Sequence, residues 1–131
     1  MNELYKNTAI EVVDLLKRKI ISPLEVVEHS ISRIDTIDKH VNALPIRCFE
    51  RAIKQAKCVK NISTNPDKYL YGLPIVVKDY NDVSGVRTTY GSPIYSDYVP
   101  IESDATIAHL EQNGAIPIAK SNVPEWAWAH F

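Results

Sequence analysis

The sequence predicts an α/β fold, and two observations support that prediction. In the first 60 residues, two segments have apolar residues at every third or fourth position, which is the period of an amphipathic helix. After residue 70, two short and continuously apolar runs at 73–77 and 115–119 are separated by a third helical segment. Continuous apolar runs rich in β-branched residues are typical of strands that are covered on both faces. We therefore expect a sheet that lies between helices.

Length and charge limit the classes of protein to which the chain can belong. Its 131 residues are enough for one hydrophobic core. The 15 basic residues are balanced by 16 acidic ones, and the basic residues form no cluster. Binding to nucleic acids or anionic membranes depends on clustered positive charge, so we expect neither partner. We expect a single domain with a mainly helical start at 1–60 and a βαβ segment at 70–131.

Two helix starts are marked by capping residues. Thr8 and Glu11 have the spacing of a capping box. Ser22 is a stronger start, because Pro23 occupies the first helical position and Glu25 the third. The expected buried stripes are Ile10, Val13, Leu16 and Ile20 in the first helix, and Leu24, Val27, Ile31 and Ile34 in the second.

The remaining elements alternate between strands, loops and helices. A short strand at 43–49 and a helix at 50–59 precede a polar loop at 61–68. The strand at 73–77 is followed by a long, turn-rich loop at 80–100, and loops of that length are usually functional or disordered. Ser103 is the expected cap of a helix at 104–112, which Asn113 and Gly114 end. The strand at 115–119 should lie beside the earlier strand and parallel to it. A further helix should begin at 123–125.

The sequence indicates no metal site, no cofactor and no membrane segment. Cys48 and Cys58 lack CxxC spacing and have no histidine pair beside them, so we expect free thiols in a reducing cytosol. No apolar run approaches the ~20 residues that a membrane-spanning helix needs, and residues 1–10 do not have the pattern of a secretory signal. We expect a cytoplasmic protein. Large aromatic residues gather near the end, which indicates a chain that stops within a core, a tail that folds back on the helices, or an intermolecular contact: Trp126, Trp128 and Phe131.

Lys78 is the first candidate for a chemical role. It directly follows the apolar strand at 73–77, and ligands in α/β folds gather outside the carboxyl ends of strands. A lysine that is partly removed from water at such a place can act as a base near neutral pH. The alternative is that Lys78 only reaches water or pairs with Asp79, and its position alone favours that alternative.

The hydroxyl groups of Thr88, Thr89 and Ser92 are candidates for binding a polar substrate. They follow Lys78 in a loop that contains glycine. Serine and threonine side chains also stabilise turns by bonding to their own backbone, and this explanation is at least as well supported. The segment does not match the glycine patterns of phosphate-binding loops, and the chain has no GxSxG motif. Phosphate binding and α/β-hydrolase chemistry are therefore disfavoured.

Several segments together resemble the N-terminal part of the amidase signature family. They occur in that family's order and spacing from about residue 70 to the end. The helices before them also suit the start of that family. The chain departs from the family's pattern at Tyr80, Ala119 and Trp126. The segments are YGLPIVVKD at 71–79, GVRTTYGSP at 85–93, SDAT at 103–106, GAIPI at 114–118 and KSNVPE at 120–125.

The resemblance implies an amidohydrolase with a Ser-cisSer-Lys triad, in which Lys78 accepts a proton through a bridging serine from a nucleophilic serine. The resemblance also implies a mixed β-sheet covered by helices on both faces, a small-molecule amide as substrate and no cofactor. It is compatible with a homodimer of the complete protein. The two serines belong to a GGSSGG-type segment and a following glycine-rich turn, which these 131 residues do not contain. We therefore expect a truncated, N-terminal part of a single amidase domain that is inactive alone.

Two other interpretations stay open. Within the same family, the A subunit of a glutamyl-tRNA(Gln) amidotransferase is a close alternative. It ranks second because GVRTTYGSP and KSNVPEWAW are more similar to stand-alone amidases. An interpretation of another class is a decayed, non-catalytic interaction module that binds a partner through its aromatic end. An in-frame GGSSGG segment downstream of Phe131 would favour the enzyme, and a natural stop codon there would favour the module.

Overall fold

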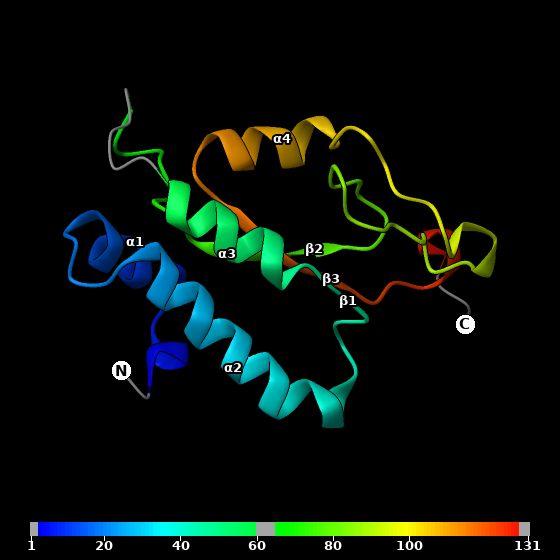
Figure 1. Ribbon diagram of the computed structural model, residues 1–131, viewed down its shortest axis with the longest axis horizontal. Helices are drawn as coiled ribbons and strands as arrows, with labels where there is room; N and C mark the ends of the chain where they lie inside the picture. Colours follow the sequence, from blue (N-terminus) through cyan, green and yellow to red (C-terminus); the bar gives the residue numbers. More distant parts are fainter. Residues whose placement is uncertain (1–2, 60–64, 129–131) are drawn as a thin grey trace.

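The computed structural model describes residues 3–59 and 65–128 of the chain (Figure 1). One mixed sheet has the strand order β1-β3-β2. Its central strand, β3 (Ile116–Ser121), is antiparallel to β1 (Ile46–Arg47) and parallel to β2 (Pro74–Lys78). The predicted α/β class and the predicted parallel pairing of the two apolar runs are therefore confirmed.

Helices cover both faces of this sheet, as predicted. The α-helices are α1 (Ala9–Lys17), α2 (Pro23–Val41), α3 (Phe49–Cys58) and α4 (Ala105–Gln112). α2 and α3 lie side by side in Figure 1 and pack on one face, where Val27 and Ala52 contact Ile116. On the other face, Ile107 of α4 packs against Val77 of β2. None of the helices in the described part of the chain is long and apolar enough to cross a membrane.

Both predicted capping boxes are formed. The amide of Glu11 donates to Thr8 Oγ1 at 3.3 Å, and the Glu11 carboxylate accepts from the Thr8 amide at 2.6 Å. Ser22 and Glu25 bond in the same way at the start of α2. These starts could be predicted because each depends on residues only three positions apart.

The stripe predicted for the first helix is wrong in part. Ile10 is 83% exposed and Ile20 is also exposed, whereas Val12 and Leu16 are buried. α1 ends at Lys17, and Lys19 has a left-handed backbone, so the helical period does not reach Ile20. The stripe predicted for α2 is confirmed, because Val27 is fully buried and Leu24, Ile31 and Ile34 pack around it.

The strand predicted at 43–49 is shorter than expected. The amides of Ala43 and Leu44 donate to the carboxylate of Asp38, at the end of α2, and not to a neighbouring strand. Only Ile46 and Arg47 pair with β3. A side chain of the preceding helix therefore takes the hydrogen bonds that would have lengthened β1.

The start of α4 also differs from the prediction. Asp104, and not Ser103, is the N-cap residue. Both residues contact the long loop: Ser103 Oγ accepts from the amide of Ser84, and the Asp104 carboxylate accepts from the amide of Asp82. Gly114, with φ +86°, follows the helix as predicted. The polar residues before α4 therefore hold the loop against the helix.

β2 is less covered than its sequence predicts. Residues 116–120 of β3 are all buried, but Val76 of β2 is 46% exposed. Within the described residues, β2 pairs with β3 alone, so it is an edge strand, and the helices leave its face at Val76 partly uncovered.

The helix predicted from 123–125 is only a 3₁₀ turn, Glu125–Ala127, in which Trp126 has a left-handed backbone with φ 53°. The Trp126 ring stacks on Tyr90 with centroids 5.7 Å apart, while Trp128 is 72% exposed. This part of the tail therefore folds back on the long loop, not on the helices. Phe131 and residues 61–64 of the expected polar loop lie outside the described residues.

Candidate active site

Lys78 is the last residue of β2, at the carboxyl edge of the two parallel strands, where it is in register with Ser121. Its side chain is exposed, so the partial burial that we expected is not found in this structure. Its ammonium lies 5.6 Å from the centroid of the Tyr80 ring, and within residues 3–59 and 65–128 it makes no hydrogen bond or ion pair. Lys78 is therefore open to groups beyond this part of the chain.

The ion pair that we considered between Lys78 and Asp79 is replaced by another. Asp79 Oδ1 lies 3.2 Å from the ammonium of Lys120, and both side chains are almost completely buried. Successive residues of a strand point to opposite faces, so Asp79 and Lys78 diverge where β2 ends. Lys120 was not among the residues predicted from the sequence. The available signal was a charged residue directly after the apolar run at 115–119, beside a strand that also ends in lysine.

Lys120 has two further hydrogen-bond partners. Its ammonium donates to the carbonyl of Asn81 at 2.8 Å and to Thr88 Oγ1 at 2.7 Å. Burial lowers the pKa of Lys120, and the nearby Asp79 carboxylate acts in the opposite direction. The amine is sealed from solvent, with 1% of the residue exposed, so it cannot meet a substrate.

The three hydroxyl groups that we predicted to bind substrate are each bonded within the chain. Thr88 is fully buried against Lys120. The hydroxyl and amide of Thr89 donate to the Asp79 carboxylate. Ser92 is buried and donates to Glu125 at 2.7 Å. These partners are side chains of other segments and not the local backbone, so the three residues tie the loop to β2, β3 and the tail. A role in binding substrate stays a prediction.

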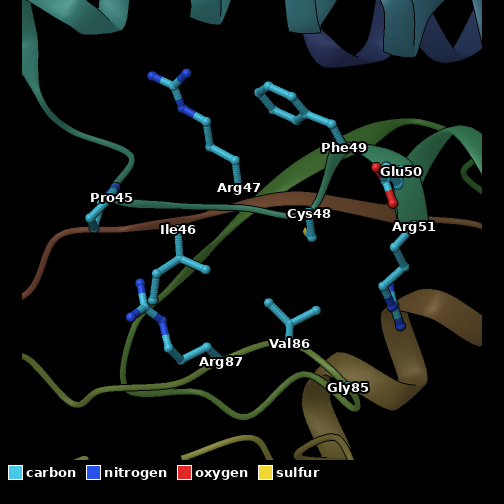
Figure 2. A pocket seen from close by; sticks show the side chains of 10 residues that line it. All are labelled: Pro45, Ile46, Arg47, Cys48, Phe49, Glu50, Arg51, Gly85, Val86 and Arg87. Atoms are coloured by element: carbon cyan, nitrogen blue, oxygen red, sulfur yellow. The ribbon is translucent and has the colours of Figure 1, made fainter. Parts of the chain in front are cut away.

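Two adjoining hollows lie between β1 and the long loop. The larger, about 570 Å³, lies between the segment 45–51 and the segment 85–87. In Figure 2, Ile46, Val86 and Arg87 lie on one side of β1, whereas Arg47 and Phe49 extend from the other. The second, about 340 Å³, shares Ile46 and Arg87 and reaches the turn after β2. The structure thus brings Asp79, Thr89 and Ser92 to one wall of the second hollow, but neither Lys78 nor Thr88.

The charged groups around these hollows are mostly paired. Arg47 contacts Asp35 and Asp38, and Arg51 contacts Glu111 at 2.7 Å. Arg87 donates only to the carbonyl of Ser96, at 3.3 Å, among the described contacts.

The residues of the described ranges offer no metal site, because no group of three or more His, Cys, Asp or Glu side chains comes together there. Cys48 and Cys58 are both free thiols, as predicted, and burial raises the pKa of Cys48.

An aromatic cluster closes the outer side of the loop. Tyr90 stacks on Tyr98 as well as on Trp126, and Tyr95 meets these rings edge-on. The hydroxyls of Tyr90 and Tyr98 both donate to the Asp82 carboxylate. Burial and this carboxylate strongly raise the pKa of Tyr90. The loop therefore carries a cluster of stacked rings, of which Tyr98 and Trp126 are partly exposed to solvent.

In comparisons with known proteins, this chain is similar to the A subunits of glutamyl-tRNA(Gln) amidotransferases from several bacteria. The chain is 35% identical over 127 residues to that of Oleidesulfovibrio alaskensis, and 36% identical over 127 residues to that of Moorella thermoacetica. These alignments cover 97% and 95% of this chain, but only 26% of each relative. The chain therefore spans about a quarter of the length of the relatives that it matches.

Solved structures share the fold. A bacterial aryl acylamidase of the amidase signature family superposes on 92% of the chain with a TM-score of 0.79 and 24% identity, and the match covers 26% of that enzyme. The native peptide amidase of Stenotrophomonas maltophilia superposes on 96% of the chain with a TM-score of 0.83 and 17% identity, again over 26% of its own length. The amidase family model matches residues 25–130. The chain therefore belongs to the amidase family, whose members are the amidase signature enzymes.

Proposed function

We propose that this chain is the N-terminal part of an amide-hydrolysing enzyme, and that Lys78 is the lysine of its Ser-cisSer-Lys triad. The observation that carries this proposal is the location of Lys78 at the carboxyl edge of two parallel strands, within the region that matches the amidase family. Ligands of α/β proteins gather at that edge. The amine there is exposed and has no hydrogen bond or ion pair among the described residues, which supports a role toward groups supplied by the rest of an amidase domain.

In the proposed reaction, a serine hydroxyl attacks the amide carbon of a small-molecule substrate, and its proton passes through a bridging serine to the amine of Lys78. The proton returns to the leaving nitrogen as the C–N bond breaks, which leaves an acyl-enzyme for water to hydrolyse. The two serines are absent from these 131 residues. A base without its nucleophile has no acyl-enzyme route, so the chain alone should release no ammonia above background.

The test compares Lys78→Ala and Lys78→Arg with the wild-type complete enzyme, by following ammonia release from small aliphatic and aromatic amides. A general base alone contributes about 10²–10⁴-fold, and triad members act as a unit, so Lys78→Ala should cost at least that much. Lys78→Arg should fail nearly as badly, because a guanidinium stays protonated and cannot accept the proton.

Thermal melts of the same samples separate chemistry from folding. Lys78 is exposed and has no ion pair in the described residues, so both variants should melt close to wild type. If Lys78→Arg retains nearly full activity, the side chain of Lys78 serves only as a positive charge and not as the base. Activity that is lost only together with the fold would make Lys78 a structural residue.

A second candidate function is that of the A subunit in a glutamyl-tRNA(Gln) amidotransferase, which the relatives at 35% and 36% identity favour. Such a protein works together with other subunits, whereas a stand-alone amidase does not need them. This function would rank first if genes for ammonia-accepting partner subunits lie beside this gene and if the activity requires those subunits.

A further inference from the structure

Lys120 is a buried charge that stability alone does not explain. Its partners are Asp79, Asn81 and Thr88, and all three come from the segment that follows β2. Buried ion pairs can often be replaced by apolar side chains of similar size without loss of stability. A lysine at this place therefore indicates a requirement for a particular geometry in the segment that it contacts.

An irregularity in β3 brings Lys120 to the face where these partners lie. Between Ile75 and Val76 the register advances by two residues on β3, from Pro117 to Ala119. Ile118 and Ala119 consequently both belong to the cluster under α2 and α3. Lys120 then pairs with Val77, which packs on the opposite face with Val83 and Val86. Without the extra residue, alternation would place Lys120 on the same face as Ile118.

The position of Lys78 depends on its backbone, because among the described residues its ammonium makes no hydrogen bond or ion pair and lies 5.6 Å from the centroid of the Tyr80 ring. Besides the pairing of β2 with β3, two hydrogen bonds hold the backbone where β2 ends: the carbonyl of Lys78 accepts from the amide of Asn81 at 3.0 Å, and the amide of Asp79 donates to the carbonyl of Ser121 at 3.1 Å. Asp79 and Asn81 are also the residues that Lys120 contacts. Lys120 thus holds both residues that hold Lys78.

We propose that Lys120 is a positioning residue for Lys78: by binding the Asp79 carboxylate and the Asn81 carbonyl, it fixes the turn from which the Lys78 side chain leaves the sheet. This inference rests on the proposed function of Lys78. Lys120 itself is sealed from solvent and takes no part in proton transfer with a substrate. The titratable groups that act on Lys120 are the carboxylates of Asp79 and Asp82 and the thiol of Cys48.

The test uses the complete enzyme and compares Lys120→Met with the double variant Lys120→Met/Asp79→Asn. The double variant is needed because Lys120→Met alone leaves the Asp79 carboxylate buried without its cation, which can prevent folding. The matched control is Ile118→Ala, which shortens a buried side chain of β3 on the other face. Each variant is characterised by kcat, KM and thermal melting.

Misplacement of a reacting group by about 1 Å can cost about 10²-fold, so kcat of the folded double variant should fall about that much while KM changes little. A fall in kcat with little change in KM indicates a misplaced reacting group and not weaker binding of the substrate. The control should lose stability and keep its kcat.

The outcomes separate this inference from the proposed function. If Lys78→Ala keeps its activity, the proposed function fails, and the role of Lys120 fails with it. If Lys78→Ala is inactive but the double variant keeps the wild-type kcat, only the positioning role is overturned. If both Lys120 variants fail to fold while Ile118→Ala folds, Lys120 is a structural residue and the inference is also overturned.

Discussion

A methyl group at Gly91 tests how closely the long loop approaches the tail. Gly91 has φ +69°, and a Cβ added there would lie 2.7 Å from the carbonyl oxygen of Val123 and 3.0 Å from that of Pro124. These are backbone atoms, so they cannot turn away as a side chain would. Gly91→Ala should therefore push the tail away from the loop.

Gly91→Ala should lower the free energy of unfolding in two ways. The left-handed backbone alone is about 1–2 kcal/mol less favourable for an alanine. Separating the two segments also strains the Ser92–Glu125 hydrogen bond, worth about 0.5–1.5 kcal/mol, and the Tyr90–Trp126 stack, worth a similar amount. The expected free-energy loss beyond the backbone cost is therefore about 1–3 kcal/mol.

Gly85→Ala is a matched control, because Gly85 has φ +72° and a Cβ there would have no atom within 4 Å. Urea unfolding followed by circular dichroism gives the free energy of unfolding for both variants and the wild type. Tryptophan fluorescence of the native state should change in Gly91→Ala and not in the control. Equal free-energy losses in the two variants, with unchanged fluorescence, would refute the close approach.

Two further predictions concern the body of the fold. Burial opposes ionisation of Asp38, but hydrogen bonds from Ala43, Arg47 and Leu44 outweigh it and lower the pKa of the carboxyl group. The ionised Asp38 therefore stabilises the folded state fully above the unfolded pKa of about 3.9, and this stabilisation disappears as the pH falls through the folded pKa. Asp38→Asn should therefore be less stable than wild type at neutral pH, and urea unfolding should show the difference shrinking below about pH 4; a constant difference would argue against this linkage. Ile116 is 1% exposed and packs between the sheet and α3, so Ile116→Ala should lower the free energy of unfolding by about 2–5 kcal/mol. Ile10 is 83% exposed, so Ile10→Ala should lower it by at most about 0.5 kcal/mol. Similar losses in both variants would contradict the core described above.

The parts of the fold that could be predicted from sequence depend on residues close together in the chain. The capping boxes at Thr8 and Ser22 and the glycine stop at Gly114 are of this kind. The short β1 and the left-handed Trp126 could not be predicted, because each is set by contacts formed only in the folded chain: Asp38 takes the amides before β1, and Tyr90 stacks on Trp126.

The candidate site divides in the same way. Lys78 could be found because a lysine at the end of an apolar run is visible in one segment. The pair of Asp79 with Lys120 could not, since it joins the ends of two strands whose relative register depends on one extra residue. The partial burial expected for Lys78 is not found, because it depends on cover that the described residues do not supply.

That extra residue in β3 makes the length of the strand a constraint separate from its composition. Deletion of Ile118 would remove the irregularity but keep Ala119 opposite Val76 and Lys120 opposite Val77, so both side chains would stay on their present faces and one buried side chain would be lost. Insertion of a residue between Ala119 and Lys120 would instead turn Lys120 toward α3, away from Asp79 and Asn81. We therefore expect strand β3 to tolerate the loss of its extra residue better than the gain of another one.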